Sequence, residues 1–479
     1  MKYTFLLTVS AIFFATQLMA QNQFPAFPPD DVSAKTDYEQ MLWQMNIVLP
    51  ELPLPMDDKN LPVGATLADS TKPNGNVMYK GMRIIRSPWG LWTNYDDYST
   101  GLFPAADSNL VWHYEPISLL KMHNGKNVKN AKEWQTKRRP EIAHDVQQYL
   151  YGFQPVTKMP AVNFKVKKND TLDNCLQYEI TGDIDVSQYP QVRNKPVIKA
   201  TLRVPKSDKP VPVMIIFGWG NPLDRYWEIM SKQGWGVCIF SPNAIQPDNG
   251  AGLTSYLLGL VNKGNWRKPT DWGSIGAWSW GISRLIDCFE TIDGVNSKAI
   301  GLMGHSRYGK ATLFTAAFEP RIAIAFPSDA GSLGTKTNRR HWGQDVEISA
   351  SASEYHWLAG AFMQWCGEEI PGQYLPRKVG KMPVDAHSLL ALCAPRPVFL
   401  NGGDDSKWID PYGVYLTGKN ASPAYELLGV RGLIMNDPKP IIDKAYIDGT
   451  IAYRCHTGGH TDLPDWDAFF EFAKKFIKN

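Results

Sequence analysis

The stretch IGLMGHSRYGKATL, residues 300–313, places Ser306 between an apolar run and a segment with helical spacing. Gly304 and Gly309 flank the serine and permit a sharp turn. An apolar strand, then G-x-S, then a helix is the setting in which a serine hydroxyl stands above the end of a sheet, at a helix N-terminus. Serine also caps helices without any chemical role, so the motif alone leaves catalysis and capping both open.

The sequence around this turn predicts a mostly parallel sheet. Short apolar segments alternate with segments of helical periodicity, which is typical of an α/β sandwich with helices on both faces of the sheet. We predict strands at 211–221, 235–243, 298–304, 321–329, 396–405 and 450–459, and helices at 226–233, 274–292, 311–318 and 465–478. Upstream, 164–168 and 197–205 alternate as antiparallel strands do, and a helix is predicted over 130–151.

The chain divides into three parts. Residues 1–20 have the features of an export signal, with Lys2 at the positive end, an apolar core and the small Ala20 before the expected cut. Residues 21–120 are rich in Pro, Asn and Asp and predict an irregular N-terminal extension packed on the core. Residues 121–479 form the α/β domain. We therefore expect a secreted or periplasmic protein without a transmembrane helix.

The composition narrows the classes of partner. Fifty Lys and Arg against 47 Asp and Glu leave a formal net charge of +3, which is too small for a nucleic-acid binder. The 17 Trp and 20 Tyr suit stacking on sugar rings, although most are expected to pack inside the protein. The six cysteines show no metal-ligand spacing. We expect a monomer that requires no metal and no cofactor and binds neither nucleic acid nor membrane.

A nucleophilic serine needs a histidine as base and a carboxylate that orients the histidine. In open sheets of this kind, both follow the serine along the chain, on loops after later strands. Asp404 and Asp405 follow one predicted strand, and His456 and His460 follow the last one. We favour His460 as the base because it lies beyond two glycines on the crest of its loop, whereas His456 lies at a strand end.

Two cationic residues lie at the start of the predicted serine helix. The backbone N–H of the residue after the nucleophile commonly contributes to the oxyanion hole, and this residue is Arg307, whose side chain would add a permanent charge. Lys310 lies one turn on, on the same helical face as Ser306. Cations oppose the N-terminal helix dipole, so the pair indicates an anionic or hydroxyl-rich ligand unless it is simply a solvated helix start.

Five blocks of the sequence resemble the glucuronoyl esterases, carbohydrate esterase family 15, especially their bacterial members. GHSRYGK resembles the family's G-[CH]-S-R-x-G-K turn, with the late glycine included. The other four blocks are EWQTKRRPEIAHDVQQYLYGFQP, RRHWGQDVE, KWIDPYG and GGHTDLPDW, and the matches run from about Lys132 to Trp466. The resemblance implies an α/β-hydrolase fold, a three-layer sandwich.

The resemblance also implies roles for individual residues. It implies Ser306 as nucleophile, His460 as base and Arg307 as stabiliser of the oxyanion. It further implies that Lys310 binds sugar hydroxyls and that Trp408 packs against the uronic acid. Gln344 stands where many members have a glutamate that contacts the sugar, and this amide can still donate and accept hydrogen bonds.

The acid of the triad is left open between two places. Members of the family place it either two residues before the tryptophan of KWIDPYG or after the strand that follows the serine helix. At the first place stands Ser406, with Asp404 and Asp405 just ahead of it. At the second stands Asp329, 23 residues after Ser306. As candidates for the triad acid, Asp405 and Asp329 rank nearly level, and Asp404 ranks behind them. The aspartates that are not the triad acid are expected to cap loops or form turns.

The predicted function is a secreted serine esterase that cleaves the ester between (4-O-methyl-)glucuronic acid on xylan and a lignin alcohol, through a Ser-His-Asp triad and an acyl-enzyme. One alternative is an acetyl-xylan esterase or another carbohydrate esterase on the same fold. Another is a glycan-binding protein whose triad has decayed. Each of these functions requires a polysaccharide or lignin–carbohydrate ligand.

Overall fold

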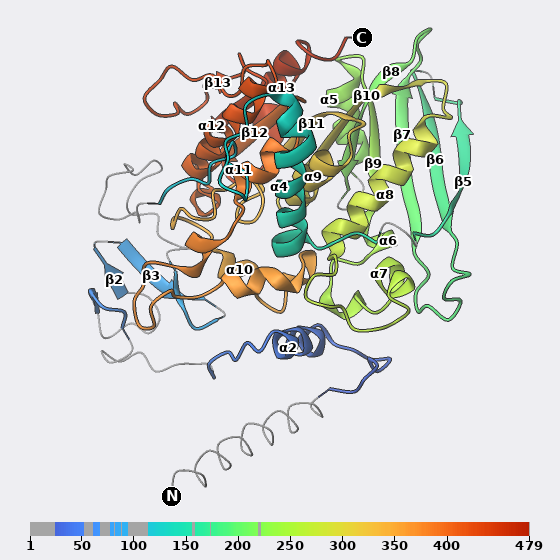
Figure 1. The fold of residues 1–479 in the computed structure, drawn as a ribbon. Coiled ribbons are helices and arrows are strands. Elements are labelled where there is room, and N and C mark those ends of the chain that lie inside the picture. The colour runs from blue at the N-terminus through green and yellow to red at the C-terminus, as the bar shows by residue number, and fades with distance from the viewer. Residues whose placement is uncertain are drawn as a thin grey trace, which may run out of the picture.

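The computed structural model describes residues 24–51, 61–67, 77–80, 82–87, 89–93, 114–155, 159–172, 174–218 and 222–478 (Figure 1). The predicted export signal, residues 1–20, lies outside the described residues. None of the described helices is both long and apolar enough to cross a bilayer. The six cysteines are all buried and unpaired.

Ten strands of the described chain form one large sheet, in the spatial order β13-β14-β12-β11-β10-β8-β9-β7-β6-β5. The neighbouring strands from β14 to β9 pair in parallel: β14 (Ile451–His456), β12 (Val398–Gly403), β11 (Ile322–Ser328), β10 (Val295–His305), β8 (Val211–Phe217) and β9 (Gly236–Phe240). Antiparallel strands flank them: β7 (Val197–Pro205), β6 (Cys175–Ile184), β5 (Val162–Asn169) and, at the other edge, β13 (Ala445–Tyr446). The predicted α/β class is confirmed, as are the antiparallel strands upstream.

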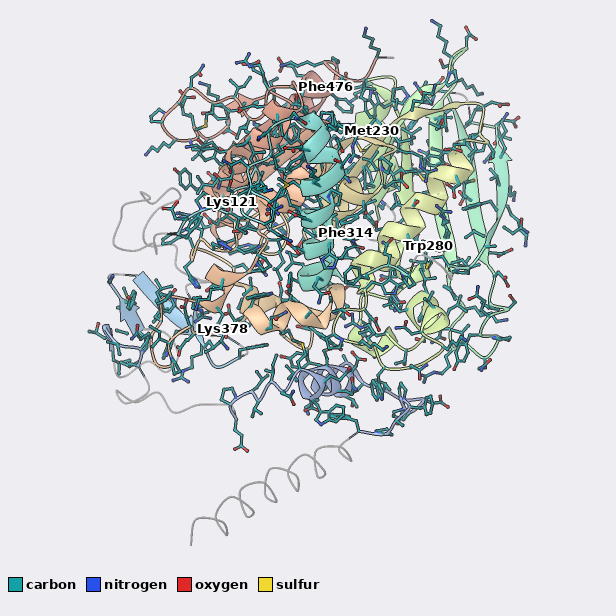
Figure 2. All side chains as sticks on the ribbon, in the orientation of Figure 1. Lys121, Met230, Trp280, Phe314, Lys378 and Phe476 are labelled. Atoms are coloured by element: carbon teal, nitrogen blue, oxygen red, sulfur yellow. The ribbon has the colours of Figure 1, made fainter. Side chains whose placement is uncertain are left out.

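Helices cover both faces of the sheet because its central strands are apolar on both sides. In β8, Val213 and Ile215 pack into the core on one face, while Met214 and Ile216 pack into the core on the other. The first face is covered by α4 (Arg139–Val146), α8 (Ser274–Phe289), α9 (Arg307–Phe318) and α12 (Pro411–Leu427). The second is covered by α5 (Leu223–Ser231) and α13 (Trp466–Ala473). Figure 2 shows side chains from the two layers, Trp280 and Phe314 from the first and Met230 from the second.

The helix predicted over 130–151 is continuous, with π-helical turns on either side of α4 at Trp134–Arg138 and Gln147–Tyr151. It begins with α3 (Ala131–Glu133) and ends at Gly152, where φ is 81°. Sequence periodicity did not reveal the remaining helices: α6 (Pro242–Ile245), α7 (Tyr256–Val261), α10 (Val346–Ser349), α11 (Ala386–Ala391) and α12. The first four are too short for a periodic signal, and α12 contains Pro423.

The described parts of the N-terminal extension contain regular structure, which corrects the expectation of an irregular segment. They form α2 (Ala34–Gln44) and a small antiparallel sheet of β1 (Ala65–Leu67), β2 (Val77–Tyr79), β3 (Met82–Arg86) and β4 (Trp92–Thr93). Some of their side chains pack against the rest of the chain: Met41 is buried in the main cluster, and Trp92 packs with Trp342. Such short strands depend on tertiary contacts, which local periodicity does not encode.

The carboxyl ends of the parallel strands meet at one edge of the sheet, so loops that are distant in sequence become neighbours there. β10, β11, β12 and β14 all end at this edge, and α8 and α9 begin there. α2 lies at the same end of the molecule, beside α7 and α10 (Figure 1). The Tyr38 hydroxyl of α2 donates to the Ala350 carbonyl at the end of α10.

Candidate active site

Ser306 occupies a strained turn between β10 and α9. Its φ is 59° and its ψ is −125°, a conformation that non-glycine residues rarely adopt and that persists at functional sites. The two flanking glycines are required by space: a Cβ at Gly304 would lie 2.3 Å from the Tyr308 carbonyl oxygen, and one at Gly309 2.6 Å from that of Ser328. The Ser306 side chain makes no capping hydrogen bond, which argues against the capping role.

His460 and Asp329 lie next to each other at the carboxyl edge of the sheet. The His460 Nδ1 is 3.2 Å from an Asp329 carboxylate oxygen, Oδ2. Asp329 is completely buried, whereas 29% of the His460 side chain is exposed. The Asp329 carboxylate also accepts from the Gly403 N–H at 3.2 Å, and the Asp329 N–H donates to the Asn401 side-chain oxygen at 2.9 Å. The carboxylate is therefore fixed by strand β12, which lies beside its own.

Asp404 and Asp405 have different surroundings from Asp329. The Asp404 carboxylate accepts from the Gly458 N–H at 2.9 Å, so it holds the loop that carries His460. Asp405 is exposed, and its backbone N–H donates to the Gly458 carbonyl. Within the described chain, Asp329 is the carboxylate that lies within 4 Å of a His460 ring nitrogen.

His456 is fully buried and paired with Asp465, at 2.8 Å between Nδ1 and Oδ2. Burial by itself lowers the pKa of His456, but the hydrogen bond and charge of Asp465 outweigh it and raise the pKa. Arg454 also contacts Asp465, at 3.0 Å. His456 therefore belongs to a buried polar cluster at the end of β14, consistent with the strand-end role that the sequence indicated.

His305, which the sequence analysis did not single out, lies against His460. The centroids of the two imidazoles are 4.2 Å apart. The His305 Nδ1 is 3.0 Å from the Ser328 hydroxyl, which the Asn401 amide also contacts at 3.2 Å. Burial, and then the neighbouring His460, lower the pKa of His305, which favours a neutral ring. Its position directly before the serine was the available sequence signal.

Arg307 is held by an acidic residue from a distant loop. Its guanidinium is 2.7 Å from the Asp248 carboxylate and lies over the Trp357 ring, 4.9 Å from the centroid. Asp248 also contacts the His356 Nε2 at 2.9 Å and accepts from the Trp357 indole N–H at 2.6 Å. Burial raises the pKa of Asp248, but these hydrogen bonds and the Arg307 charge prevail and lower it to about 2. The carboxylate is therefore ionised at neutral pH and fixes the cation.

Lys310 is buried beneath the loop that follows β11. Its Nζ donates to the carbonyls of Ala330 and Ser332, at 2.5 and 2.6 Å. Burial lowers the pKa of Lys310 to about 8, and the nearby Glu354 carboxylate opposes this shift. Glu354, which the sequence analysis also missed, has a buried carboxylate oxygen without a hydrogen-bond partner among the described residues. It lies seven residues after the block RRHWGQDVE and outside every quoted block, which left no signal for it.

Gln344 and Trp408 lie together above this loop. The Gln344 N–H donates to the Trp408 carbonyl at 2.6 Å, and its side-chain oxygen accepts from the Ser332 N–H at 3.3 Å. The Trp408 ring lies beside the His460 imidazole, with 4.9 Å between centroids. The structure thus brings Gln344, Trp408 and the Lys310 loop to the His460 side of the sheet edge.

The same edge contains donors suited to a metal ion. Among the described residues, His305, Asp329 and His460 offer ligand atoms that lie within 4.8 Å of one another. Two imidazoles and a carboxylate are donors that zinc accepts. In this group, however, the His305 Nδ1 is engaged with the Ser328 hydroxyl, and the Asp329 carboxylate with the Gly403 N–H. The arrangement therefore places a His–Asp pair, with 3.2 Å between its nearest nitrogen and oxygen, at the same sheet edge as Ser306.

Replacing Asp248 by asparagine is expected to lower kcat about 10-fold to 100-fold, because Arg307 loses the charge that fixes it and small misplacements at a reacting centre have effects of this size. Steady-state kinetics on benzyl glucuronate would measure the change. The matched control is Asp405→Asn, which removes an exposed carboxylate from the same edge. Equal kcat for Asp248→Asn and the wild-type protein would contradict the proposed importance of this pair.

Comparisons with known proteins agree on one family. The family model for glucuronyl esterase of fungi matches residues 189–429 of the 479-residue chain. A carbohydrate esterase from an unknown prokaryotic organism is 28% identical over 403 residues, which cover 74% of this chain and 88% of that protein. A 4-O-methyl-glucuronoyl methylesterase from Wolfiporia cocos is 27% identical over 323 residues, and the alignment covers 64% of this chain and 70% of that protein.

Solved structures give the same result. A glucuronoyl esterase from Teredinibacter turnerae superposes with a TM-score of 0.72 at 29% identity, covering 92% of this chain and 99% of the other. A glucuronoyl esterase from Solibacter usitatus gives a TM-score of 0.68 at 26% identity, covering 77% and 99%. The family match, the fold and the strained serine at the same sheet edge as a His–Asp pair lead to one conclusion: this chain belongs to the glucuronyl esterase family.

Proposed function

We propose that this protein is a secreted serine esterase that hydrolyses esters of (4-O-methyl-)glucuronic acid, such as those that join glucuronoxylan to lignin alcohols. The observation that carries the proposal is the His460–Asp329 pair at 3.2 Å, at the same sheet edge as the strained Ser306. Its membership of the glucuronyl esterase family supports the substrate class. The export signal predicted from the sequence of residues 1–20 supports the proposed extracellular location.

In the proposed reaction, the Ser306 hydroxyl attacks the carboxyl carbon of the uronate ester while His460 takes its proton. His460 then gives this proton to the departing alcohol. Asp329 holds the imidazole in the productive tautomer through Nδ1 and stabilises the imidazolium that forms. Water, activated by His460, hydrolyses the acyl-enzyme and releases the uronic acid.

Arg307 is proposed to stabilise the negative charge that develops on the carbonyl oxygen when Ser306 attacks. The backbone N–H after the nucleophile is a usual oxyanion donor, and the Arg307 guanidinium adds a cation that Asp248 and Trp357 hold in place. Preorganised donors of this kind stabilise the transition state because no reorganisation is needed during the reaction.

The sugar ring is proposed to lie between Trp408 and the segment around Lys310 and Gln344. Lys310, from beneath, and Gln344 both hydrogen-bond the loop at 330–332, so together they fix this loop beside the proposed ring position. Trp408 supplies an apolar face next to His460. This combination fits a hydroxyl-bearing ring whose ester group points toward the catalytic pair.

The experiment compares two esters. Benzyl glucuronate is expected to be hydrolysed with a kcat/KM about 10²-fold or more above that for an acetylated xyloside, because only the uronate ester places its ring against Lys310 and Trp408. A serine-directed phosphonate should label Ser306, as shown by peptide mass spectrometry. Preferential release of acetate would identify an acetyl-carbohydrate esterase, and an unlabelled, inactive protein would identify a decayed glycan binder.

A further inference from the structure

A second pocket lies on the same end of the molecule as the candidate active site. It has a volume of about 530 Å³ and is lined by Ala26, Gln40, Trp43, Gln44, Asn262, Asn265, Trp266, Lys268 and Asp271. Its walls are the C-terminal half of α2 and the loop that joins α7 to α8. We call it the Trp43–Trp266 pocket. Four of its nine lining residues therefore come from the N-terminal extension and five from the α/β domain.

The two indoles of this pocket are fixed in place and half-buried. Phe24 packs against both, with centroids 6.0 Å from Trp43 and 6.3 Å from Trp266. The Trp266 indole N–H donates to the Pro25 carbonyl at 3.0 Å. Rigid aromatic rings provide contact area at little entropic cost, which suits recognition of a flat ligand face.

Side-chain amides complete the pocket. The Gln44 amide N donates to the Gln40 side-chain oxygen and to the Arg267 carbonyl, both at 2.7 Å, which fixes the orientation of both glutamines. The Asn265 amide is likewise fixed on the Asn262 carbonyl at 2.8 Å. Within the described residues, the Asn262 side-chain nitrogen is buried without a hydrogen-bond partner.

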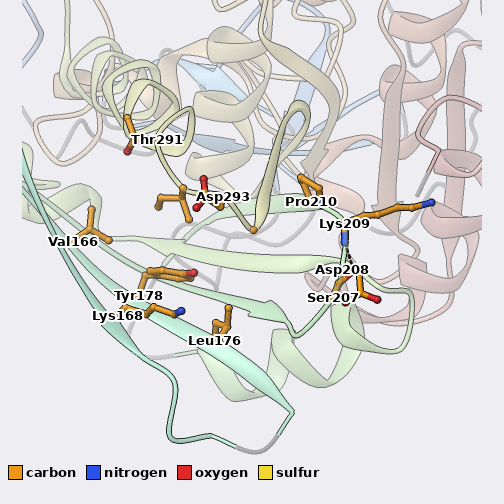
Figure 3. A pocket seen from close by; sticks show the side chains of 12 residues that line it. Val166, Lys168, Leu176, Tyr178, Ser207, Asp208, Lys209, Pro210, Thr291 and Asp293 are labelled. Carbon is orange, nitrogen blue, oxygen red and sulfur yellow. Dashed lines mark hydrogen bonds between the residues drawn. The ribbon is translucent and has the colours of Figure 1, made fainter.

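Another pocket of similar size provides a contrast (Figure 3). It has a volume of about 470 Å³ and is lined by residues of β5 and β6 and of the loops at 207–210 and 291–294. These loops precede β8 and β10, so this pocket lies at the opposite edge of the parallel sheet from Ser306. Tyr178 is the aromatic residue in its lining. The lining also contains four charged residues, Lys168, Asp208, Lys209 and Asp293. It has neither the paired indoles nor the amides.

α2 connects the Trp43–Trp266 pocket to the active-site edge. At its N-terminal end Ala34 lies against Gly250, two residues after the Asp248 that holds Arg307. In its middle, the Tyr38 ring packs against Tyr355, with 5.0 Å between centroids. Tyr355 immediately follows Glu354, whose charge acts on Lys310. One helix therefore contacts the residues next to the active site through its N-terminal end and middle, and lines the pocket through its C-terminal half.

We propose that the Trp43–Trp266 pocket is a second carbohydrate-binding site, which takes neutral pyranose residues of the polysaccharide that carries the ester. Indole faces stack on the apolar face of a sugar ring, and amides donate to and accept from its neighbouring hydroxyls. The choice of a xylan-type glycan rests on the proposed function, whereas the site itself rests on the pocket. Its role is to hold the polymer near the catalytic serine.

The test uses xylohexaose, a neutral linear oligosaccharide that carries no ester. Binding is measured by isothermal titration calorimetry, so its outcome does not depend on whether the protein hydrolyses glucuronate esters. The wild-type protein is expected to bind, and the double variant Trp43→Ala/Trp266→Ala is expected to raise Kd at least about 10-fold, because two stacking faces are lost. The matched control is Trp227→Ala. Trp227 is a half-buried tryptophan of α5, and its ring packs under Arg203 of β7.

A second variant distinguishes a loss of binding from a change in the fold. Trp43→Phe keeps an aromatic face of smaller area and is expected to recover part of the affinity, which a merely structural loss would not explain. Circular dichroism and thermal unfolding of each variant show whether α2 remains docked. Absence of xylohexaose binding to the wild-type protein would overturn the proposal, as would equal affinities of the wild-type protein and a folded double variant.

Discussion

Replacing Ser306 by alanine is expected to lower kcat for benzyl glucuronate by about 10⁶-fold, the size of effect seen when the nucleophile of a serine hydrolase is removed. The physical reason is that no other group can form the acyl-enzyme at this position. The residual rate would come from the Arg307 cation and the backbone donors, which stabilise the oxyanion without the serine. Steady-state kinetics with the purified variant would measure it.

The control for this variant is Ser353→Ala, at an exposed serine outside the strained turn. The fold of Ser306→Ala should be intact, because the turn is held by the backbone hydrogen bond from the Ser306 N–H to the Ser328 carbonyl, at 2.9 Å, and by the flanking glycines. A Ser306→Ala variant that kept a tenth of the wild-type kcat would remove this serine from the mechanism.

Asp329→Asn is expected to lower kcat about 10⁴-fold, whereas Asp405→Asn should change it less than about twofold. An amide at position 329 cannot stabilise the imidazolium of His460, and it can favour the wrong tautomer of the neutral ring. Asp405 is exposed, and its backbone N–H, not its carboxylate, contacts the Gly458 carbonyl on the His460 loop. Parallel kcat measurements on benzyl glucuronate compare the two variants.

Thermal unfolding separates chemistry from stability in this pair. The Asp329 carboxylate accepts from the Gly403 N–H, and an asparagine oxygen can keep this hydrogen bond, so Asp329→Asn should remain folded. The reverse ranking, with Asp405→Asn inactive and Asp329→Asn active, would place the acid after β12 and leave the His460–Asp329 contact without a catalytic role.

Local sequence patterns predicted the elements that carry strong periodicity. The apolar runs at 211–217 and 322–328 are strands buried on both faces, and the segment at 274–289 is a helix, as predicted. The pattern did not reveal α2 or the small sheet of the extension, because those elements are stabilised by contacts such as Met41 and Trp92 make with distant parts of the chain.

The sequence by itself determined the fold class, the sharp turn at Ser306 and the candidates for nucleophile, base and acid, because each of these follows from a run of neighbouring residues. Only the tertiary structure showed that Asp329, and not Asp405, lies next to His460. The two aspartates follow adjacent strands, β11 and β12, but Asp329 is buried and Asp405 is exposed. It also placed His305 against His460 and Asp248 against Arg307. Side-chain direction at the end of a strand depends on how neighbouring strands pair, and this pairing joins residues far apart in the chain.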